Sequence, residues 1–436
     1  MTGRRFAALL ALVVVAAGAG RVAYVLGVTR HDRGLYDAVF YELAARGLVE
    51  GRGFTNPYPF VTEPVPAADH PPLTQLVLVP AAWLGRSDET IRLGMRFTMV
   101  LVGMATVAVV GLAGRAVRDE TTGLAAAGIA AVSPAFWMND GLIMSESLAA
   151  LASAAILLLA LRLRDRSTLA LAAGAGAAVA VATLTRAELV LFLPALVLPA
   201  IAACRSRPAR DRWRAAAVAV GMAALGVAPW VGFNLARFQE PTFVSTGDGL
   251  VLRGANCDRT YRGPELGSWS VFCVLDSFRT DPRSGYKVDL DEQSVTARRL
   301  RAEGLRYLRA HLDRLPVVMA ARVGRLWSVY RVDQAIGGEV EGRPGWATAA
   351  GVGFWWLTVP GALAGTLVLR RERRPVWPLW VPVAMVTALA AVFYGTARFR
   401  VPAEPALAVL AAVAVAATVT RCRTRPGPGG PVPPAG

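Results

Sequence analysis

The chain has 436 residues, of which 54% are hydrophobic and 18% charged, and its formal net charge is +16. Apolar runs rich in alanine, valine and leucine recur along almost the whole length. About 20 helical residues cover the roughly 30 Å hydrocarbon core of a bilayer, and only helices or closed barrels satisfy their backbone groups there. The composition therefore favours an all-α polytopic membrane protein over a soluble domain.

The positive charge is explained by topology. A basic patch is typical of nucleic-acid binding, but here the arginines stand in short clusters between apolar runs, as in cytoplasmic loops. We therefore expect no nucleic-acid partner. The clusters are Arg162/Arg164/Arg166, Arg205/Arg207/Arg210/Arg212/Arg214, Arg370/Arg371/Arg373/Arg374 and Arg421/Arg423/Arg425.

With the N-terminus in the cytoplasm, these clusters fix one consistent path through the membrane. The apolar stretch Leu73–Leu84 is too short for a comfortable span, so we expect a juxtamembrane or re-entrant piece on the outer side. If it did span, every later helix would be inverted. Ten membrane helices are predicted, at about 6–28, 91–114, 121–138, 144–161, 167–184, 188–203, 214–233, 346–369, 376–394 and 402–420.

The same path predicts four regions and cytoplasmic termini. The amphipathic stretch 316–330, which contains Arg322, is expected to lie at the membrane interface. The Pro/Gly-rich tail is expected to be disordered. The regions are a transmembrane module at 1–233 with a catalytic outer first loop at 29–72, an extracytoplasmic cap with a juxtamembrane helix at 234–330, C-terminal helices at 331–420 and the cytoplasmic tail at 421–436.

The four cysteines fall into two pairs by compartment. Cys204 and Cys422 adjoin arginine clusters and are assigned to the reducing cytoplasm. Cys257 and Cys273 share the long outer segment, where a disulfide can persist, and we expect one there. Two cysteines without further ligands at zinc spacing do not make a metal site, so no metal is expected.

Charged and polar clusters that are distant in sequence all map to the outer face. Helix ends at the headgroup level carry charges at little cost, but charges near membrane helices are also functional candidates. Arginine grips phosphate and a carboxylate can act as a general base, so the joint placement favours a site for an anionic substrate. The clusters are Asp37 with Tyr41, 69–72, Asp140 with Ser145 and Glu146, 185–188, and 398–404.

Within these clusters, two residues have a plainer interpretation. Asp140 is expected to be a polar loop residue, and Arg186 is expected to pair with Glu188 in a structural role.

Several ordered motifs carry a resemblance to a known family. They are 36–41 (YDAVFY), 48–54 (LVEGRGF), 67–73 (AADHPPL), 144–146 (MSE), 184–188 (LTRAE), 228–230 (APW) with Asn234, and 394–405 (YGTARFRVPAEP). In this order and spacing the chain resembles the GT-C superfamily of glycosyltransferases, in its family 39-like branch of aminoarabinose-transferase-like and protein O-mannosyltransferase-like enzymes.

The resemblance implies a bundle of membrane helices that transfers a sugar from a polyprenyl-monophosphate donor to an extracytoplasmic acceptor. It implies Asp37 as the general base that takes the acceptor proton. The leaving polyprenyl phosphate needs cationic stabilisation. No cofactor is expected. The sugar, with mannose and arabinose among the candidates, and the acceptor, whether glycan, lipid or protein, are not determined.

The resemblance also suggests donor-phosphate contacts. The family often has a basic residue where this chain has His70, a weaker and pH-dependent cation, or simply a turn residue before Pro71. Arg398 and Arg400 are therefore the better candidates for the phosphate.

Further positions have two interpretations each. Glu146 matches a second acidic position that would support catalysis, or it is a carboxylate favoured at a helix N-terminus. Tyr41, Asp69 and Glu404 are candidate substrate contacts, and Asp69 is an alternative base.

Two other functions stay open. A lipid or glycan transporter or flippase would have as many helices, but transporters place coupling residues near the bilayer midplane, and the predicted helix centres carry almost no ionisable groups. A non-catalytic relative would share the motifs but would be indifferent to replacement of Asp37 with asparagine.

Overall fold

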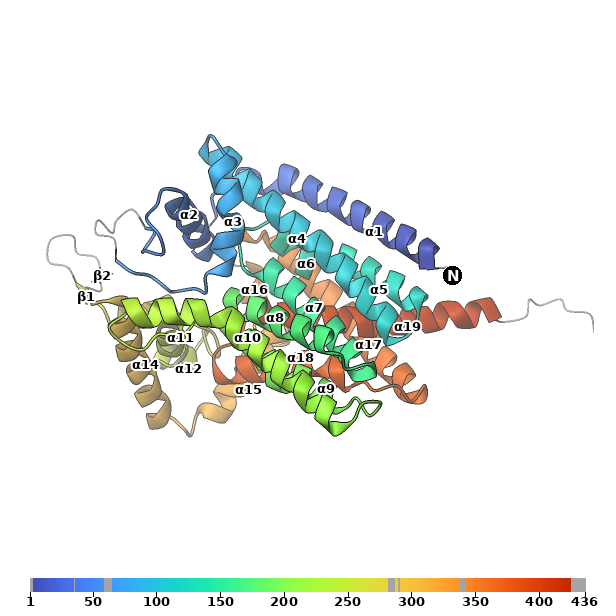
Figure 1. The fold of residues 1–436 in the computed structure, drawn as a ribbon. Coiled ribbons are helices and arrows are strands. Elements are labelled where there is room, and N and C mark those ends of the chain that lie inside the picture. The colour runs from blue at the N-terminus through green and yellow to red at the C-terminus, as the bar shows by residue number, and fades with distance from the viewer. Residues whose placement is uncertain are drawn as a thin grey trace, which may run out of the picture.

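The computed structural model describes residues 3–34, 36–58, 65–280, 287–288, 291–337 and 342–424. The tail expected to be disordered lies outside the described residues from position 425 onward. Long helices lie along the length of the molecule, and shorter elements gather at one end (Figure 1). The long helices are α1 (Gly3–Tyr24), α4 (Asp88–Val117), α5 (Glu120–Val132), α7 (Glu146–Asp165), α8 (Leu169–Thr185), α10 (Ala209–Arg237), α17 (Gly345–Arg371), α18 (Trp377–Val392) and α19 (Glu404–Thr424).

Each of the ten predicted membrane segments is helical. In the described part of the chain six helices are long and apolar enough to span a bilayer, and a seventh span results if α5 and α6 (Pro134–Asp140), bent by 53°, count as one. The other three predicted segments form shorter apolar helices: α8, α18 and the stretch Ala187–Ala202. Helix α3 (Leu73–Leu84) is also short and packs against α2 (Asp37–Val49) and α4. The chain is a multi-pass membrane protein.

The stretch Ala187–Ala202 is broken for a local reason. It divides into the 3-10 helix η2 (Ala187–Leu191), the π-helix η3 (Leu193–Val197) and α9 (Leu198–Ala202). Pro194 and Pro199 stand at the starts of η3 and α9. Proline has no amide hydrogen to donate and clashes with the preceding turn, so it interrupts a continuous helix.

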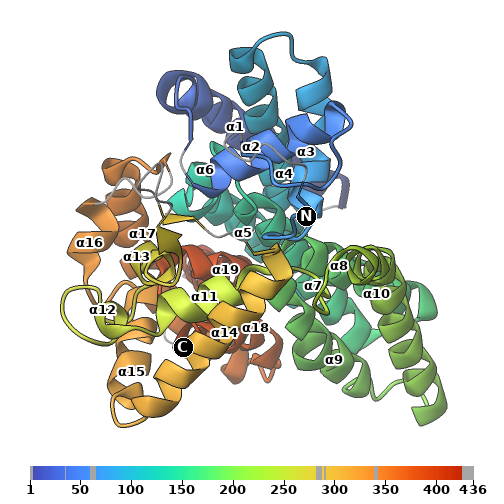
Figure 2. The same ribbon diagram turned by 90° about the vertical axis from the view of Figure 1, so that its left-hand side faces the viewer.

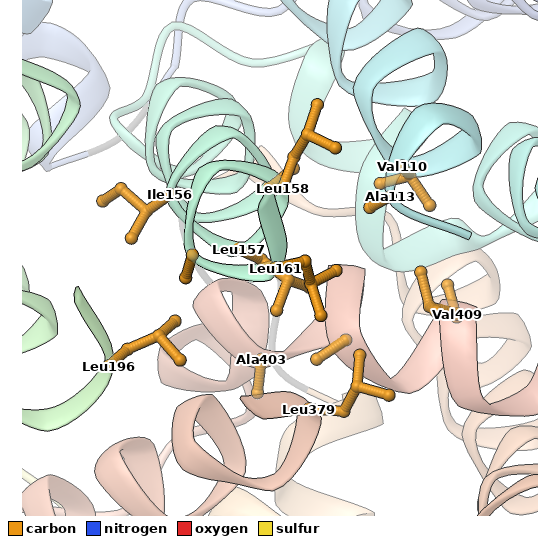
Figure 3. Close-up of a cluster of buried hydrophobic side chains, with 14 of the residues drawn as sticks. Val110, Ala113, Ile156, Leu157, Leu158, Leu161, Leu196, Leu379, Ala403 and Val409 are labelled. Carbon is orange, nitrogen blue, oxygen red and sulfur yellow. The ribbon is translucent and has the colours of Figure 1, made fainter. Parts of the chain in front are cut away.

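The core of the bundle forms around α7. Its side chains Ile156, Leu157, Leu158 and Leu161 are buried and point toward different neighbouring helices (Figure 3). Val110 and Ala113 of α4 and Val409 of α19 lie in the same cluster. Because α7 packs against several neighbouring helices, the core fixes the backbone position of Glu146, its first residue.

The remaining elements lie at the end of the bundle that faces the viewer in Figure 2, away from the N-terminus and the C-terminal end of α19. We call this group the end layer. It comprises α2, α11 (Gly247–Ala255), α12 (Asp258–Tyr261), α13 (Val271–Leu275), β1 (Arg279–Thr280), β2 (Lys287–Val288) and α14 (Gln293–Ala310). Strands β1 and β2 pair antiparallel over two residues each. Cys257, which precedes α12, is disulfide-bonded to Cys273 in α13.

Arginines hold the end layer against the membrane helices. The predicted interfacial stretch forms α15 (Leu315–Leu326), but its Arg322 is fully buried. The guanidinium donates to the carbonyls of Ala255 at 2.7 Å and Val392 at 2.8 Å, joining the end of α11 to the end of α18. The Arg322 side chain of this stretch therefore points into the protein, where backbone carbonyls take up its polar head. Helix α16 (Val332–Gly337) follows.

A second buried ion pair corrects the expectation for Asp140. It lies at the end of α6 and is not an exposed loop residue: its carboxylate accepts a 2.7 Å bond from Arg21 of α1 and a 2.6 Å bond from Ser147 of α7. A short π-helix, η1 (Val25–Thr29), continues α1 beyond this contact. Gly103 of α4 leaves the room that the Asp140 carboxylate occupies, since a Cβ there would lie 1.9 Å from it.

Candidate active site

A cavity of about 1050 Å³ lies between the end layer and the bundle. One end of it is polar, with carboxylates, a histidine and arginines, and the rest of its wall is mainly apolar and aromatic. The polar end is lined by Asp37, Tyr41, Asp69, His70, Ser145, Arg186, Glu188 and Arg398. Further polar side chains of the lining are Thr185, Ser245, Asp248, Glu265 and Ser270. The apolar lining comes mainly from η2, α11, α13 and α18 and includes Leu189, Val190, Leu191, Leu250, Val251, Phe272, Val386, Leu389, Phe393 and Tyr394.

Asp37 is the first residue of α2, and a strained residue sets its direction. Tyr36 has a φ of 48°, in the left-handed region that a bulky side chain rarely adopts. Such backbone strain persists only where the surrounding structure imposes it, and it clusters at functional sites. The turn at Tyr36 starts the helix so that Asp37 lines the cavity.

Arg398 joins two carboxylates from distant parts of the sequence. It lies in η5 (Ala397–Ala403), and its Nη2 is 2.8 Å from Oδ2 of Asp37. Its Nε donates to Oε1 of Glu146. Asp37 and Arg398 are 361 positions apart in the chain, so two of the predicted site residues meet only through the tertiary fold.

Glu146 lies behind Arg398 and does not belong to the described cavity lining. Its side chain is 1% exposed, and Arg186 and Arg343 approach it at 3.5 and 3.8 Å. Three arginines from separate segments thus surround one buried carboxylate. This arrangement suits a residue that orients the arginines, and it places no acceptor within direct reach of Glu146.

His70 lies beside Asp37, with its Nε2 3.6 Å from Oδ1 of the carboxylate. Its ring packs at 4.9 Å from Phe40 and 5.0 Å from Tyr41, both of α2. Burial lowers the pKa of His70, but the Asp37 carboxylate outweighs burial and raises the pKa above its ordinary value. His70 is therefore a cation over a wider pH range than a free imidazole.

Asp37 has a correspondingly acidic carboxyl. Burial raises its pKa, but His70 and Arg398 outweigh burial and hold the pKa well below its usual range. Opposite charge within a few ångströms favours the ionised form. Asp37 is therefore ionised across the physiological range.

Arg400 and Glu404 lie apart from this cluster. They form a buried pair at 2.5 Å, one helical turn apart, and Arg400 covers the ring of Trp355 at 4.3 Å. Neither belongs to the described lining of the cavity. The structure thus separates them from the other candidates, because their side chains turn toward α17 and each other, and we remove them from the site.

One arginine at the site was not singled out from the sequence, and another has a second role there. Arg343 precedes α17 and donates to Asn139 at 3.0 Å as well as approaching Glu146. Arg186 pairs with Glu188 at 2.7 Å, as expected, but it also lines the cavity. No local pattern distinguishes Arg343 from the other arginines, since its role depends on partners about 200 residues away.

Among the residues that the structure describes, no group of three or more histidine, cysteine or acidic side chains could hold an ion.

Comparisons with known proteins agree with the fold. Residues 69–233 match the family model described as dolichyl-phosphate-mannose-protein mannosyltransferase. The oligosaccharyltransferase AglB of Archaeoglobus fulgidus, solved with an inhibitory peptide and a dolichol-phosphate, is 15% identical with a TM-score of 0.57. That match covers 94% of this chain and 50% of AglB, so the chain spans about half the length of that protein.

Two further solved structures are more distant in shape. ArnT of Cupriavidus metallidurans, bound to undecaprenyl phosphate, is 16% identical with a TM-score of 0.43, covering 97% of this chain and 80% of that one. The Pmt1–Pmt2 complex of S. cerevisiae, bound to the sugar donor, is 14% identical with a TM-score of 0.43, covering 58% and 37%. No curated protein sequence matches the chain.

The helical bundle with its end layer thus has the fold of a GT-C membrane protein. The fold shared with AglB and the family match at 69–233 confirm the resemblance to GT-C glycosyltransferases that the sequence motifs indicate.

Proposed function

We propose that the protein is a glycosyltransferase that moves a sugar from a polyprenyl-monophosphate donor to a hydroxyl group of an extracytoplasmic acceptor. The observation that carries the proposal is Arg398, which lies with two aspartates at the polar end of a cavity whose other wall is apolar. A sugar phosphate on an isoprenoid chain needs both surroundings in one site.

The apolar wall gives the donor chain a path to the bilayer. Val190 and Leu191 of η2 line the cavity and are 43% and 39% exposed. Val386 and Leu389 of α18 face the same cavity. An isoprenoid chain between η2 and α18 would bury apolar surface at about 25 cal/mol per Å², while its phosphate reaches the arginines.

Cations and carboxylates are closely paired at the polar end of the cavity. Arg186, Arg343 and Arg398 are matched by Asp37, Glu146 and Glu188. Protonated His70 adds a fourth cation and ionised Asp69 a fourth carboxylate, so the charges of the cluster balance. Arg398 and His70 are the cations of the cavity that lie beside Asp37 and can turn to a bound phosphodiester. When the sugar leaves, the phosphate gains a second negative charge, and preorganised arginines stabilise that charge most strongly in the transition state.

The reaction needs a carboxylate to accept the proton of the acceptor hydroxyl as its oxygen attacks the anomeric carbon. The family resemblance points to Asp37 for this role, and Asp69 is the other aspartate of the polar end. The third carboxylate there, Glu188, is paired with Arg186.

We further propose that the end layer, including the cap at 234–330, faces the extracytoplasmic side. Arg118 at the opposite end pairs with Glu372 at 2.9 Å, and Arg374 reaches the carbonyl of Val117 at 2.8 Å, so two arginine-rich loops meet there. An impermeant maleimide should label Arg262→Cys in intact cells but label Arg373→Cys only after permeabilisation. The reverse pattern would overturn the orientation.

The activity is tested with purified protein and a panel of polyprenyl-phosphate sugars. The expected result is release of polyprenyl phosphate and gain of sugar mass on an acceptor, both lost in Arg398→Gln. Movement of the intact donor across a vesicle bilayer without cleavage would instead identify a flippase, and no release with any donor would overturn the proposal.

A further inference from the structure

The two aspartates at the polar end of the cavity lie in opposite surroundings. Asp37 is bound by two cations, Arg398 at 2.8 Å and His70 at 3.6 Å. Asp69 lines the same cavity, yet among the described residues it makes no ion pair. The side chain facing it is a neutral amide, that of Gln293 at the start of α14.

The segment that carries Asp69 is held firmly from three sides. Ala68 donates its amide to Oε1 of Gln293 at 2.6 Å, and its carbonyl accepts from the amide of Thr246 at 2.8 Å. Arg237 of α10 donates to the carbonyl of Ala67, also at 2.8 Å. Because the side-chain oxygen of Gln293 accepts from Ala68, its NH2 group donates to Asp69. Such supporting contacts fix the direction of a reactive side chain.

A general base must offer a free oxygen lone pair to the substrate. The carboxylate of Asp37 is already bonded through one oxygen to Arg398 and lies next to His70 through the other. A proton taken up there would break contacts with both cations. Among the described residues no cation is ion-paired with Asp69, and the hydrogen bond from Gln293 is that of a neutral amide.

We propose that Asp69 accepts the proton of the acceptor hydroxyl, and that Asp37 is a positioning residue that aims Arg398 and His70 at the donor phosphate. This inference rests on the proposed function and replaces the role that the family resemblance gives to Asp37.

The step balances as follows. The acceptor O–H proton moves to a carboxylate oxygen of Asp69 while the acceptor oxygen forms a bond to the anomeric carbon. The bond from that carbon to the phosphate oxygen breaks, and its electron pair stays on the phosphate. Polyprenyl phosphate leaves with one further negative charge, opposite Arg398, and Asp69 later gives its proton to solvent.

The electrostatics of the two carboxyls support this division. Burial raises the pKa of Asp69, and the opposing effects of His70 and Gln293 do not cancel it, whereas the pKa of Asp37 is held well below its usual range. A base is more effective when its pKa approaches the working pH. Paired carboxyls pushed to opposite pKa values are the common sign of divided acid–base roles.

The test compares matched asparagine variants in the donor-cleavage assay. Asp69→Asn should lower kcat by about 100-fold or more, the usual contribution of a general base, with the donor KM unchanged. Asp37→Asn should instead raise the donor KM and keep the acidic limb of the pH–kcat profile. The exposed Asp88→Asn, whose residue pairs with Arg46 outside the cavity, serves as the control.

A second variant gives a readout that a structural role would not move. Gln293→Leu removes a hydrogen bond that favours the ionised form of Asp69, so the acidic limb of kcat should shift to higher pH. Asp69→Asn with kcat within twofold of wild type, or loss of the acidic limb in Asp37→Asn, would overturn the inference. If wild-type protein cleaves no donor, the proposed function fails first, and this inference fails with it.

Discussion

Replacement of Arg398 with glutamine tests the centre of the proposed site. The substitution keeps a long polar side chain but removes the charge that lies between Asp37 and Glu146. A hydrogen bond to a charged group contributes about 1.5–3 kcal/mol, and 1.4 kcal/mol corresponds to a tenfold change in affinity. The variant should therefore bind polyprenyl phosphate about 10- to 140-fold more weakly.

The same change has a limited cost in stability. Removal of one partner from a buried ion pair can cost about 3–5 kcal/mol, but Glu146 retains Arg186 at 3.5 Å and Arg343 at 3.8 Å. We therefore expect a folded protein with a modestly lower thermal midpoint. Arg398→Lys should recover only part of the affinity, because one ammonium group cannot bridge both carboxylates as the Nε and Nη2 atoms of arginine do.

The assay is equilibrium binding of labelled polyprenyl phosphate to purified protein in detergent. Arg30→Gln provides a matched control, because Arg30 pairs with Glu89 at 3.0 Å in an exposed position, where such pairs contribute at most about 1 kcal/mol. Binding by Arg398→Gln within twofold of wild type, with the control also unchanged, would refute the assignment of the phosphate to this arginine.

Three further predictions concern pH, the buried ion pair and the disulfide. Because the pKa of His70 is raised, its charge is complete below the ordinary value of about 6.5 and is lost as the pH rises through the raised value; donor affinity should fall over that range. His70→Lys should hold the affinity to higher pH and His70→Gln should remove the dependence, whereas an unchanged pH profile in His70→Gln would contradict the role of this cation. Arg21→Met leaves Asp140 buried without its ion-pair partner and should cost about 3–5 kcal/mol; Arg21→Met with Asp140→Leu should recover much of the loss in thermal denaturation, and equal losses in the single and double variants would refute the account. The double variant Cys257→Ser/Cys273→Ser removes a disulfide that joins residues 16 positions apart, and it should destabilise the end layer by about 3 kcal/mol. The expected result is faster proteolysis of the end layer; resistance to protease equal to that of the wild type would count against a stabilising role for the disulfide.

The sequence by itself predicted where the apolar helices lie. Helix formation in lipid depends on local apolar length, so all ten segments could be predicted from windows of about 20 residues. The arginine clusters gave each loop an expected side of the membrane, and this predicted that Asp37, His70 and Arg398 share one face before any contact was known. Local chemistry also predicted the Arg186–Glu188 pair, since the two residues are neighbours in the chain.

Only the tertiary structure decided which of these groups touch. Arg398 and Arg400 stand two positions apart in the same motif, yet η5 turns the first toward Asp37 and the second toward Glu404 and Trp355. Partners such as Arg343 and Gln293 come from segments about 200 residues away from Asn139 and Ala68, and no local pattern encodes such a pairing. The direction of a side chain at a helix end depends on the helix's rotation, which the packing of the whole bundle sets, and so the division between Asp37 and Asp69 became visible only in the fold.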